Sequence, residues 1–75
     1  MQIRILGTGC PKCKALYENT QAAVRATGVD ANIEKVEKIT EIIRYGVITP
    51  ALVVNDEVKS AGKALSADRI SELLT

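Results

Sequence analysis

The 75-residue sequence lacks any long apolar segment, and this absence limits where the protein works. A transmembrane helix needs about 18 or more consecutive apolar residues, and no run in this chain approaches that length. The N-terminus also lacks a basic region followed by an apolar region and a cleavage site, which together mark a secretory signal peptide. We therefore expect a cytoplasmic protein with no membrane partner.

An excess of charge of either sign is also missing. Ten Lys and Arg residues stand against nine Asp and Glu residues, so the formal net charge is only +1. A surface that binds nucleic acid or an anionic membrane normally carries a clear excess of positive charge. We therefore expect no nucleic-acid partner, and small neutral molecules and proteins remain the candidate partners.

The chain has no His, Phe or Trp, and its only aromatic residues are Tyr17 and Tyr45. Its core must therefore be built from aliphatic side chains. A chain of this length forms one small domain, residues 1–75, which buries only about 60% of the surface that the unfolded chain exposes. We expect this domain to be a monomer.

Cysteine is scarce as well, and the only two cysteines are three residues apart in the segment 7–13, GTGCPKC. In a reducing compartment such a pair is more often catalytic or metal-binding than a structural disulfide. A bridge that closed so short a loop would also constrain the unfolded chain little. Cys10 and Cys13 are therefore the first candidates for a functional site.

The residues around this pair predict that Cys10 lies at the start of a helix. Apolar and polar residues alternate over 1–5, as in a strand, and no Gly or Pro follows Pro11 until Gly28. Pro11 suits the first position of a helix, and Cys10 would then occupy the cap. Free backbone N–H groups and the helix dipole would favour the thiolate of Cys10.

Cys13 lies one helical turn further on and is predicted to be the more buried of the two. It shares a helix face with the residues most likely to pack against a sheet, which are Leu16, Tyr17, Thr20 and Val24. Unequal exposure gives each sulfur a role in thiol-disulfide exchange. Cys10 would attack a disulfide, and Cys13 would resolve the mixed disulfide.

The rest of the chain predicts three further strands and two further helices. We expect strands over 29–34, 51–54 and 57–60, a hairpin turn at Asn55-Asp56, a short helix that Gly46 ends, and a last helix after Ser66. The apolar faces of these helices are Ile39, Ile42 and Ile43 in the first and Ile70, Leu73 and Leu74 in the second. The resulting order is βαβαββα.

This order, the Cys-x-x-Cys at the first helix start and the Thr49-Pro50 pair before the third strand together resemble the thioredoxin-like superfamily in its minimal, glutaredoxin-sized form. More closely, residues 5–13 (ILGTGCPKC), 45–47 (YGV) and 49–54 (TPALVV) are similar to the small "redox-active disulfide protein 2" group of prokaryotic thioredoxin-like proteins. The resemblance covers essentially the whole chain. It implies an α/β, thioredoxin-like fold with a four-stranded mixed sheet and three helices.

The resemblance also implies a substrate-binding site beside the cysteines. In the superfamily the peptide bond before the corresponding proline is cis. The backbone of the residue before it, here Thr49, pairs with an extended substrate segment, and the proline, here Pro50, keeps other groups off the sulfurs. Gly9, Pro11 and Lys12, which flank Cys10 or follow it, complete the expected substrate-binding set.

Two classes of function remain open. The first is a thiol-disulfide oxidoreductase that reduces protein disulfides or carries electrons from a flavin-dependent, thioredoxin-reductase-like donor, with Cys10 and Cys13 as its catalytic residues and no bound cofactor. The second is a small module in which the two thiolates bind copper or zinc. A closed zinc site needs four ligands, so a second chain would have to contribute. Metallochaperones of that type end on a strand, whereas the end of this chain has helical spacing, so we favour the oxidoreductase.

Overall fold

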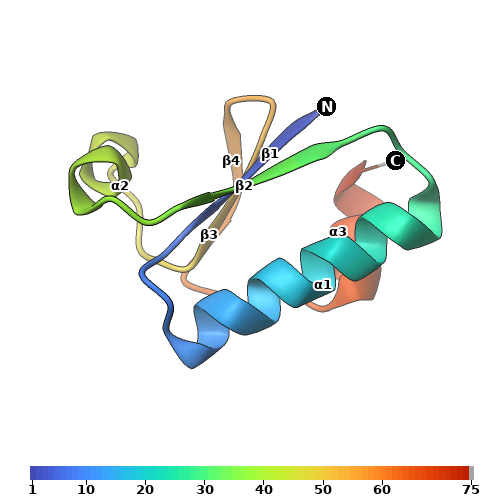
Figure 1. Ribbon diagram of the computed structural model, residues 1–75, viewed down its shortest axis with the longest axis horizontal. Coiled ribbons are helices and arrows are strands. Elements are labelled where there is room, and N and C mark those ends of the chain that lie inside the picture. The colour runs from blue at the N-terminus through green and yellow to red at the C-terminus, as the bar shows by residue number, and fades with distance from the viewer. Residues whose placement is uncertain (75) are drawn as a thin grey trace.

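The computed structural model describes residues 1–74, and its elements follow the predicted order (Figure 1). They are β1 (Gln2–Leu6), α1 (Pro11–Thr27), β2 (Asn32–Val36), α2 (Ile39–Tyr45), β3 (Ala51–Val54), β4 (Glu57–Ala61) and α3 (Ala67–Leu74). These three helices and four strands confirm the predicted minimal α/β architecture. Within the described residues, no helix combines the length and the hydropathy that crossing a bilayer requires.

The four strands form one mixed sheet in the order β2-β1-β3-β4. β1 pairs in parallel with β2 and antiparallel with β3, and β3 pairs antiparallel with β4. The parallel pair is connected through α1. In this register Leu6, at the end of β1, lies beside Val36 on one side and Ala51 on the other. The loops that follow β1 and β2 and the loop that precedes β3 therefore meet at one end of the sheet.

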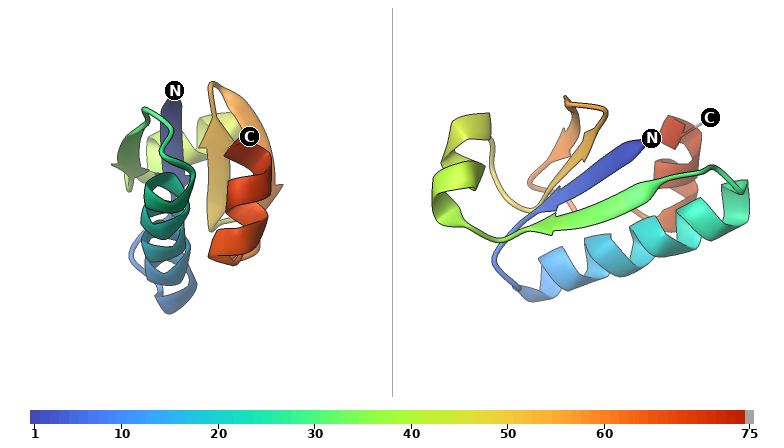
Figure 2. Two further views of the ribbon diagram at one scale, coloured as in Figure 1. Left: turned by 90° about the vertical axis from the view of Figure 1, so that its right-hand side faces the viewer. Right: turned by 45° about the horizontal axis from the view of Figure 1, so that its top comes forward.

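Helices cover both faces of the sheet (Figure 2). α1 and α3 lie on one face, and with β1 and β3 they enclose the larger core, which is formed by Ile3, Ile5, Leu16, Ala23, Leu52, Val54, Ile70 and Leu74. α2 lies on the other face over a smaller core of Leu6, Val36, Ile42, Ala51 and Val53. All four residues of β3 are buried, because helices cover the sheet on both faces of this strand.

The second strand is displaced from its predicted position, because it runs over Asn32–Val36 instead of 29–34. Pairing with β1 sets this limit: Asn32 lies beside Gln2, the first residue of β1, so residues 29–31 have no strand residue to pair with. Val29 and Ala31 still pack against the larger core as part of the connection from α1. Val29 and Ala31 alternate with polar residues because their side chains pack against this core, although they do not belong to a strand.

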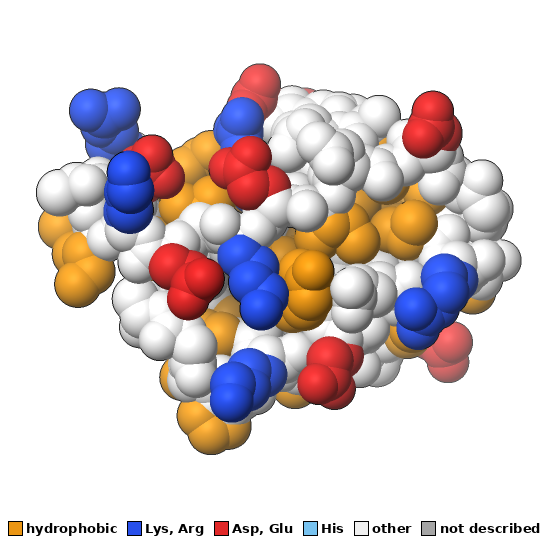
Figure 3. Space-filling view, in the orientation of Figure 1, with side chains coloured by type: hydrophobic (Ala, Val, Ile, Leu, Met, Phe, Trp, Pro, Cys, Tyr) orange, Lys and Arg blue, Asp and Glu red, His pale blue; other side chains and the backbone are white. Residues whose placement is uncertain are grey.

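The apolar face predicted for α2 is only partly buried. Ile42 packs into the smaller core, but Ile39 is 64% exposed and Ile43 is 68% exposed. α2 is a seven-residue helix at one end of the sheet, so only one side of it meets the sheet. Figure 3 shows the resulting apolar surface over α2, at the left of the view. In α3, likewise, Ile70 and Leu74 are buried, whereas Leu73 is 39% exposed.

The hairpin turn between β3 and β4 agrees with its prediction. Asn55 and Asp56 have φ values of 49° and 66°, the positive values that a two-residue type I′ turn requires. Asn55 also connects the turn to β1, because its side-chain oxygen accepts a hydrogen bond of 2.9 Å from the backbone N–H of Gln2. The turn is thus part of the sheet as well as a reversal of the chain.

Candidate functional site

Cys10 is the N-cap of α1, as the sequence predicts. Its backbone is extended, with φ −68° and ψ 162°, and Pro11 occupies the first turn of the helix. The Cys10 Sγ atom accepts a hydrogen bond of 3.3 Å from the backbone N–H of Cys13. A sulfur thus takes the place of the oxygen that usually caps a helix, and it lies at the positive end of the helix dipole.

This placement favours the charged form of Cys10. Hydrogen bonding to the Cys13 thiol is the main cause that lowers the pKa of Cys10 below its ordinary value, and the backbone N–H groups of Cys13 and Lys12 lower it further. Each of these donors stabilises a negative sulfur more than a neutral one. Cys10 is also exposed, so its thiolate is accessible to a partner from solvent.

Cys13 has the opposite environment. Its side chain is buried in the first turn of α1, with only 6% of its surface exposed. Burial raises the pKa of Cys13, and the hydrogen bond between its thiol and the Cys10 sulfur raises it further because that bond favours the protonated form of Cys13; repulsion by a negative Cys10 acts in the same direction. The predicted difference in exposure between the two cysteines is confirmed, and both are free thiols in this structure.

Gly7, which directly follows β1, is a further component of the site. A Cβ atom at position 7 would overlap the Sγ atom of Cys13 and lie 3.0 Å from its Cβ atom. The absence of a side chain therefore creates the space that the buried sulfur occupies. Gly9 has a different reason to be glycine, because its φ is +85° and nothing lies within 4 Å of the position that a Cβ would take.

The loop before β3 lies at the same end of the sheet as the cysteines. Ala51 pairs with Leu6, so Pro50 comes level with the start of the loop that leads to Cys10. The Thr49–Pro50 peptide bond is cis. The backbone N–H of Gly62 lies 2.9 Å from the carbonyl oxygen of Ile48 and 2.8 Å from that of Pro50, donating to both, and so holds this loop in place. Pro50 is buried, whereas Thr49 is exposed.

The remaining predicted site residues form the exposed rim of the dithiol. Gly9, Pro11 and Lys12 are all exposed, next to or between the two cysteines. Lys12 makes no ion pair with any residue in the described part of the chain. The structure thus brings Cys10, Cys13, Gly9, Pro11 and Lys12 together at the start of α1, and it places Thr49 and Pro50 on the adjacent loop.

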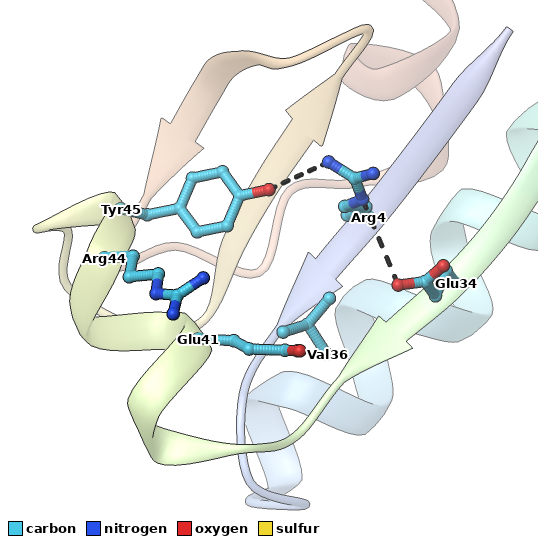
Figure 4. Close-up of a pocket in the computed structure, with 6 residues that line it drawn as sticks. All are labelled: Arg4, Glu34, Val36, Glu41, Arg44 and Tyr45. Carbon is cyan, nitrogen blue, oxygen red and sulfur yellow. Dashed lines mark hydrogen bonds and ion pairs between the residues drawn. The ribbon is translucent and has the colours of Figure 1, made fainter.

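A separate cavity of about 340 Å³ lies on the other side of the sheet, beneath α2. Figure 4 shows Arg4 on the β1 side of this cavity, with dashed lines joining it to Tyr45 and Glu34. The Arg4 guanidinium donates a 2.9 Å hydrogen bond to the Tyr45 hydroxyl, and it forms ion pairs of 2.8 Å with Asp56 and 4.0 Å with Glu34. No cysteine lines this cavity, and the Arg4 guanidinium on its wall is already paired, so we assign it a structural role.

The fold and the site together define a class of protein. An exposed thiol with a lowered pKa lies one helical turn before a buried thiol with a raised pKa, where the chain passes from the first strand of a small α/β fold into its first helix. The first sulfur is accessible and favours the thiolate, so it can attack a disulfide. The second sulfur is buried and protonated, so it reacts only after the first. Thiol-disulfide exchange by a dithiol needs this difference. The class is that of the dithiol oxidoreductases.

Comparison with known proteins identifies the family. The thioredoxin domain family matches residues 1–75, and the chain belongs to this family. It is 44% identical over 72 residues to a thioredoxin of Methanocaldococcus jannaschii, covering 96% of this chain and 84% of that protein. It is 37% identical over 76 residues to a thioredoxin of Methanothermobacter thermautotrophicus, covering 100% of this chain and 99% of that protein.

These relationships establish the general activity, which is that of a thiol-disulfide oxidoreductase. They give no support to the alternative of a copper- or zinc-binding module. The last element, α3, is also the helix that distinguishes this fold from that alternative.

Proposed function

We propose that the protein reduces disulfide bonds in other proteins, with Cys10 as the attacking nucleophile and Cys13 as the resolving thiol. The observation that carries this assignment is the opposite character of the two sulfurs: Cys10 is exposed with a lowered pKa, and Cys13 is buried with a raised pKa. Only the thiolate is nucleophilic, so the sulfur that is both ionised and accessible reacts first.

Reduction then takes two exchange steps. The Cys10 thiolate attacks one sulfur of the substrate disulfide, forming a mixed disulfide and releasing the first substrate thiolate, which takes up a proton. Cys13 loses its proton and attacks Cys10 Sγ. The bond between Cys10 and the substrate breaks, and the second substrate thiolate leaves and is protonated. The protein loses two electrons and forms the Cys10–Cys13 disulfide, and the substrate gains both electrons.

The loop at Thr49 and Pro50 supports the binding of an extended substrate segment. Thr49 is exposed, and its backbone N–H and carbonyl groups make no hydrogen bond to any other residue among 1–74. A substrate backbone can pair with these groups while its disulfide approaches Cys10, as an added strand pairs with an open sheet edge. Gly9, Pro11 and Lys12 form the opposite side of this binding site.

The oxidised protein needs an electron donor to return to the dithiol. We assign this role to a flavin-dependent, thioredoxin-reductase-like enzyme, because the Cys10–Cys13 disulfide takes up two electrons through two exchange steps with a reductase dithiol, and a flavin can supply electrons to such a dithiol in pairs. The protein would then act as a cytoplasmic carrier between that reductase and its disulfide substrates.

The first test is an equilibrium titration in dithiothreitol redox buffers, with free thiols trapped by alkylation and read by intact mass. We expect a reversible two-electron intramolecular disulfide with a midpoint of about −300 to −200 mV. Metal content is measured on the same sample. Failure to form a disulfide within the monomer would contradict the proposal, as would a metal at a fixed ratio that protects both thiols.

Cysteine variants test the order of attack. Cys13→Ser should accumulate a mixed disulfide with an oxidised protein substrate, because the resolving thiol is missing. Cys10→Ser should accumulate none on the same timescale, because the remaining thiol is buried. Mass spectrometry after acid quenching reads both variants. The reverse pattern would exchange the two roles.

A further inference from the structure

A groove of about 260 Å³ lies between β4 and α3, at one edge of the sheet. Among residues 1–74, β4 pairs with β3 alone, so its other edge is open, and α3 lies beside it (Figure 2). We call this space the β4–α3 groove. It is bordered by residues 59–61 of β4, by Lys63 and Leu65 of the connecting loop, and by Arg69, Glu72 and Leu73 of α3.

A β-bulge in β4 directs two polar side chains into this groove. Ser60 pairs with Leu52 and Val58 pairs with Val53, so Lys59 is an extra residue between the two pairs. Strict alternation along a strand would send Lys59 and Ser60 to opposite faces of the sheet, whereas both line the groove. The bulge therefore places an ammonium group and a hydroxyl group side by side on the face that α3 covers.

The loop between β4 and α3 is fixed at two points. The backbone N–H of Gly62 donates hydrogen bonds to the carbonyl oxygens of Ile48 and Pro50, in the loop that precedes β3. The side chain of Asn19 donates a 2.9 Å hydrogen bond to the carbonyl oxygen of Leu65, which packs against the larger core. The β4–α3 groove is therefore preformed, and it adjoins the loop that the proposed function assigns to substrate binding.

Positive charge predominates in the groove. Three cations, Lys59, Lys63 and Arg69, accompany one carboxylate, Glu72, so the lining has a net charge of +2. Lys63 makes no ion pair with a described residue. Lys59 pairs with Glu57 at 2.8 Å and Arg69 pairs with Glu72 at 3.4 Å, but the two carboxylate side chains are 72% and 67% exposed. Exposed pairs contribute little net energy, so both cations can exchange their partner for another carboxylate.

An apolar strip lies among these charges. Leu73 is 39% exposed, and Leu65 is partly buried. A partner that covers this strip removes apolar surface from water. An apolar strip with three surrounding cations is complementary to a peptide segment in which an apolar residue is flanked by Asp or Glu. A second copy of the groove would repel the first, because each lining is positive, and a chain with a net charge of +1 lacks the broad basic surface that nucleic acid requires.

We propose that the β4–α3 groove docks disulfide-containing partner proteins that carry such an acidic segment with a central apolar residue. The inference rests on the proposed function and defines a class of substrate for it. The carboxylates of the segment pair with Lys59, Lys63 and Arg69, and its apolar side chain covers Leu65 and Leu73. A docked partner is held at the cysteine end of the sheet, which raises the effective concentration of its disulfide near Cys10.

Binding is measured by ¹H–¹⁵N NMR titration of the reduced protein with an acetylated and amidated peptide of sequence GEELDEG. We expect saturable shifts at the amides of residues 59–65 and 69–73, with a dissociation constant below about 1 mM. The matched peptide GKKLKKG should not bind. The peptide GEESDEG, which lacks the apolar residue, should bind about two- to fivefold more weakly.

Charge reversals locate the binding site on the protein. Lys63→Glu and Arg69→Glu should each weaken binding of GEELDEG at least about threefold, because each replaces an attraction by a repulsion. Lys38→Glu is the matched control, since it changes the net charge equally but lies at the start of α2, on the other face of the sheet. It should change the affinity by less than about 1.5-fold, and raising the salt concentration should weaken binding to the wild type.

The kinetic test compares two substrates, each a cysteine peptide joined to 2-thiopyridine by a disulfide. One carries GEELDEG through a Gly/Ser linker of about 10 or 20 residues, with a root-mean-square span of about 17 or 25 Å, and the other carries the linker alone. Attack by Cys10 releases pyridine-2-thione. At micromolar substrate the acidic peptide should react at least about threefold faster with the wild type, and this advantage should disappear in Lys63→Glu.

Several outcomes would overturn the docking site and leave the proposed function intact. These are no saturable shift with about 5 mM GEELDEG, equal binding of GKKLKKG, an equal loss of affinity in Lys38→Glu, or binding without a rate advantage. Tighter binding of inorganic phosphate or oligothymidylate at the same amides would assign the groove to a phosphate-bearing ligand instead. The proposed function fails separately, if the wild-type dithiol releases no pyridine-2-thione from the substrate that carries the linker alone.

Discussion

At the scale of single residues, two chemically identical side chains in one turn of helix differ because their neighbours differ. Cys10 lies outside the core and receives hydrogen bonds from Cys13, which favour a negative sulfur. Cys13 is surrounded by the core and faces Cys10, and both surroundings disfavour a second negative charge. The three-residue spacing supplies both effects, because it places one sulfur at the cap and the other on the buried face.

This difference predicts the pH dependence of alkylation. The thiolate is the reactive form, so a lowered pKa moves the rise in reaction rate to lower pH and a raised pKa moves it to higher pH. Cys10 should react with iodoacetamide well below pH 8.5, the ordinary thiol pKa being about 8.5, and Cys13 should react only above it. Peptide mapping after timed alkylation separates the two sites. Equal rates at both cysteines, with an ordinary midpoint, would show that the helix start does not activate Cys10.

The contact between Gly7 and the Cys13 sulfur gives a second prediction. Gly7→Ala should destabilise the reduced protein by about 1–3 kcal/mol, because the new methyl group occupies the space of the sulfur. Urea unfolding measures this cost. In the Cys13→Ala background the sulfur is gone, so most of the cost should disappear. An equal cost in both backgrounds would place the clash elsewhere.

At the scale of elements, Arg4 connects parts of the chain that are distant in sequence. It extends from the middle of β1 and contacts the last residue of α2, the β3–β4 turn and β2 through Tyr45, Asp56 and Glu34. Its side chain is only 30% exposed, so these contacts are less screened than those of a fully exposed pair. α2 covers only part of its face of the sheet. On the part that it leaves uncovered, Arg4 and its partners form a polar network in place of an apolar layer.

Arg4→Met should lower the free energy of unfolding by more than Arg44→Met does, because it removes the charged hydrogen bonds and keeps the aliphatic stem. Urea unfolding at neutral pH measures the loss. Arg44→Met is the matched control: the Arg44 side chain lines the same cavity but makes no hydrogen bond or ion pair within residues 1–74, and its removal should change stability by less than about 0.5 kcal/mol. Equal effects of the two variants would argue against the network.

At the scale of the whole molecule, a small core has to support the reactive end of the sheet. The radius of gyration is 11.0 Å, and the core that holds α1 against the sheet consists of eight buried aliphatic side chains. For 75 residues the free energy of unfolding is roughly 4–11 kcal/mol. A substitution that leaves a single large cavity in this core therefore removes a substantial part of the free energy of unfolding.

Leu16 is completely buried, three residues after Cys13 on the same helix face. Leu16→Ala should cost about 2–5 kcal/mol and lower the midpoint of thermal unfolding, as measured by circular dichroism. Ile43→Ala removes a side chain that is 68% exposed and should stay within about 0.5 kcal/mol of the wild type. Similar losses for both would mean that α2 contributes more to the core than its exposure shows.

Much of this molecule was predictable from local sequence patterns. The cap at Cys10 and the turn at Asn55-Asp56 depend on backbone conformations that a few neighbouring residues decide, and both have the predicted geometry. The order of the elements and the buried side of α1 follow in the same way from short-range periodicity. Boundaries that depend on pairing were less predictable, as the late start of β2 shows.

What the sequence alone determined is therefore the local chemistry: a thiol pair at a helix start, one sulfur outward and one inward. Only the tertiary structure decided which long-range neighbours each group meets. Three contacts join residues whose proximity no spacing rule encodes: Gly7 lies against the Cys13 sulfur, Lys35 lies over the Tyr17 ring, and Arg4 contacts Tyr45, Asp56 and Glu34. Sheet register and helix docking create these contacts, because they depend on the packing of the whole chain and on no single segment.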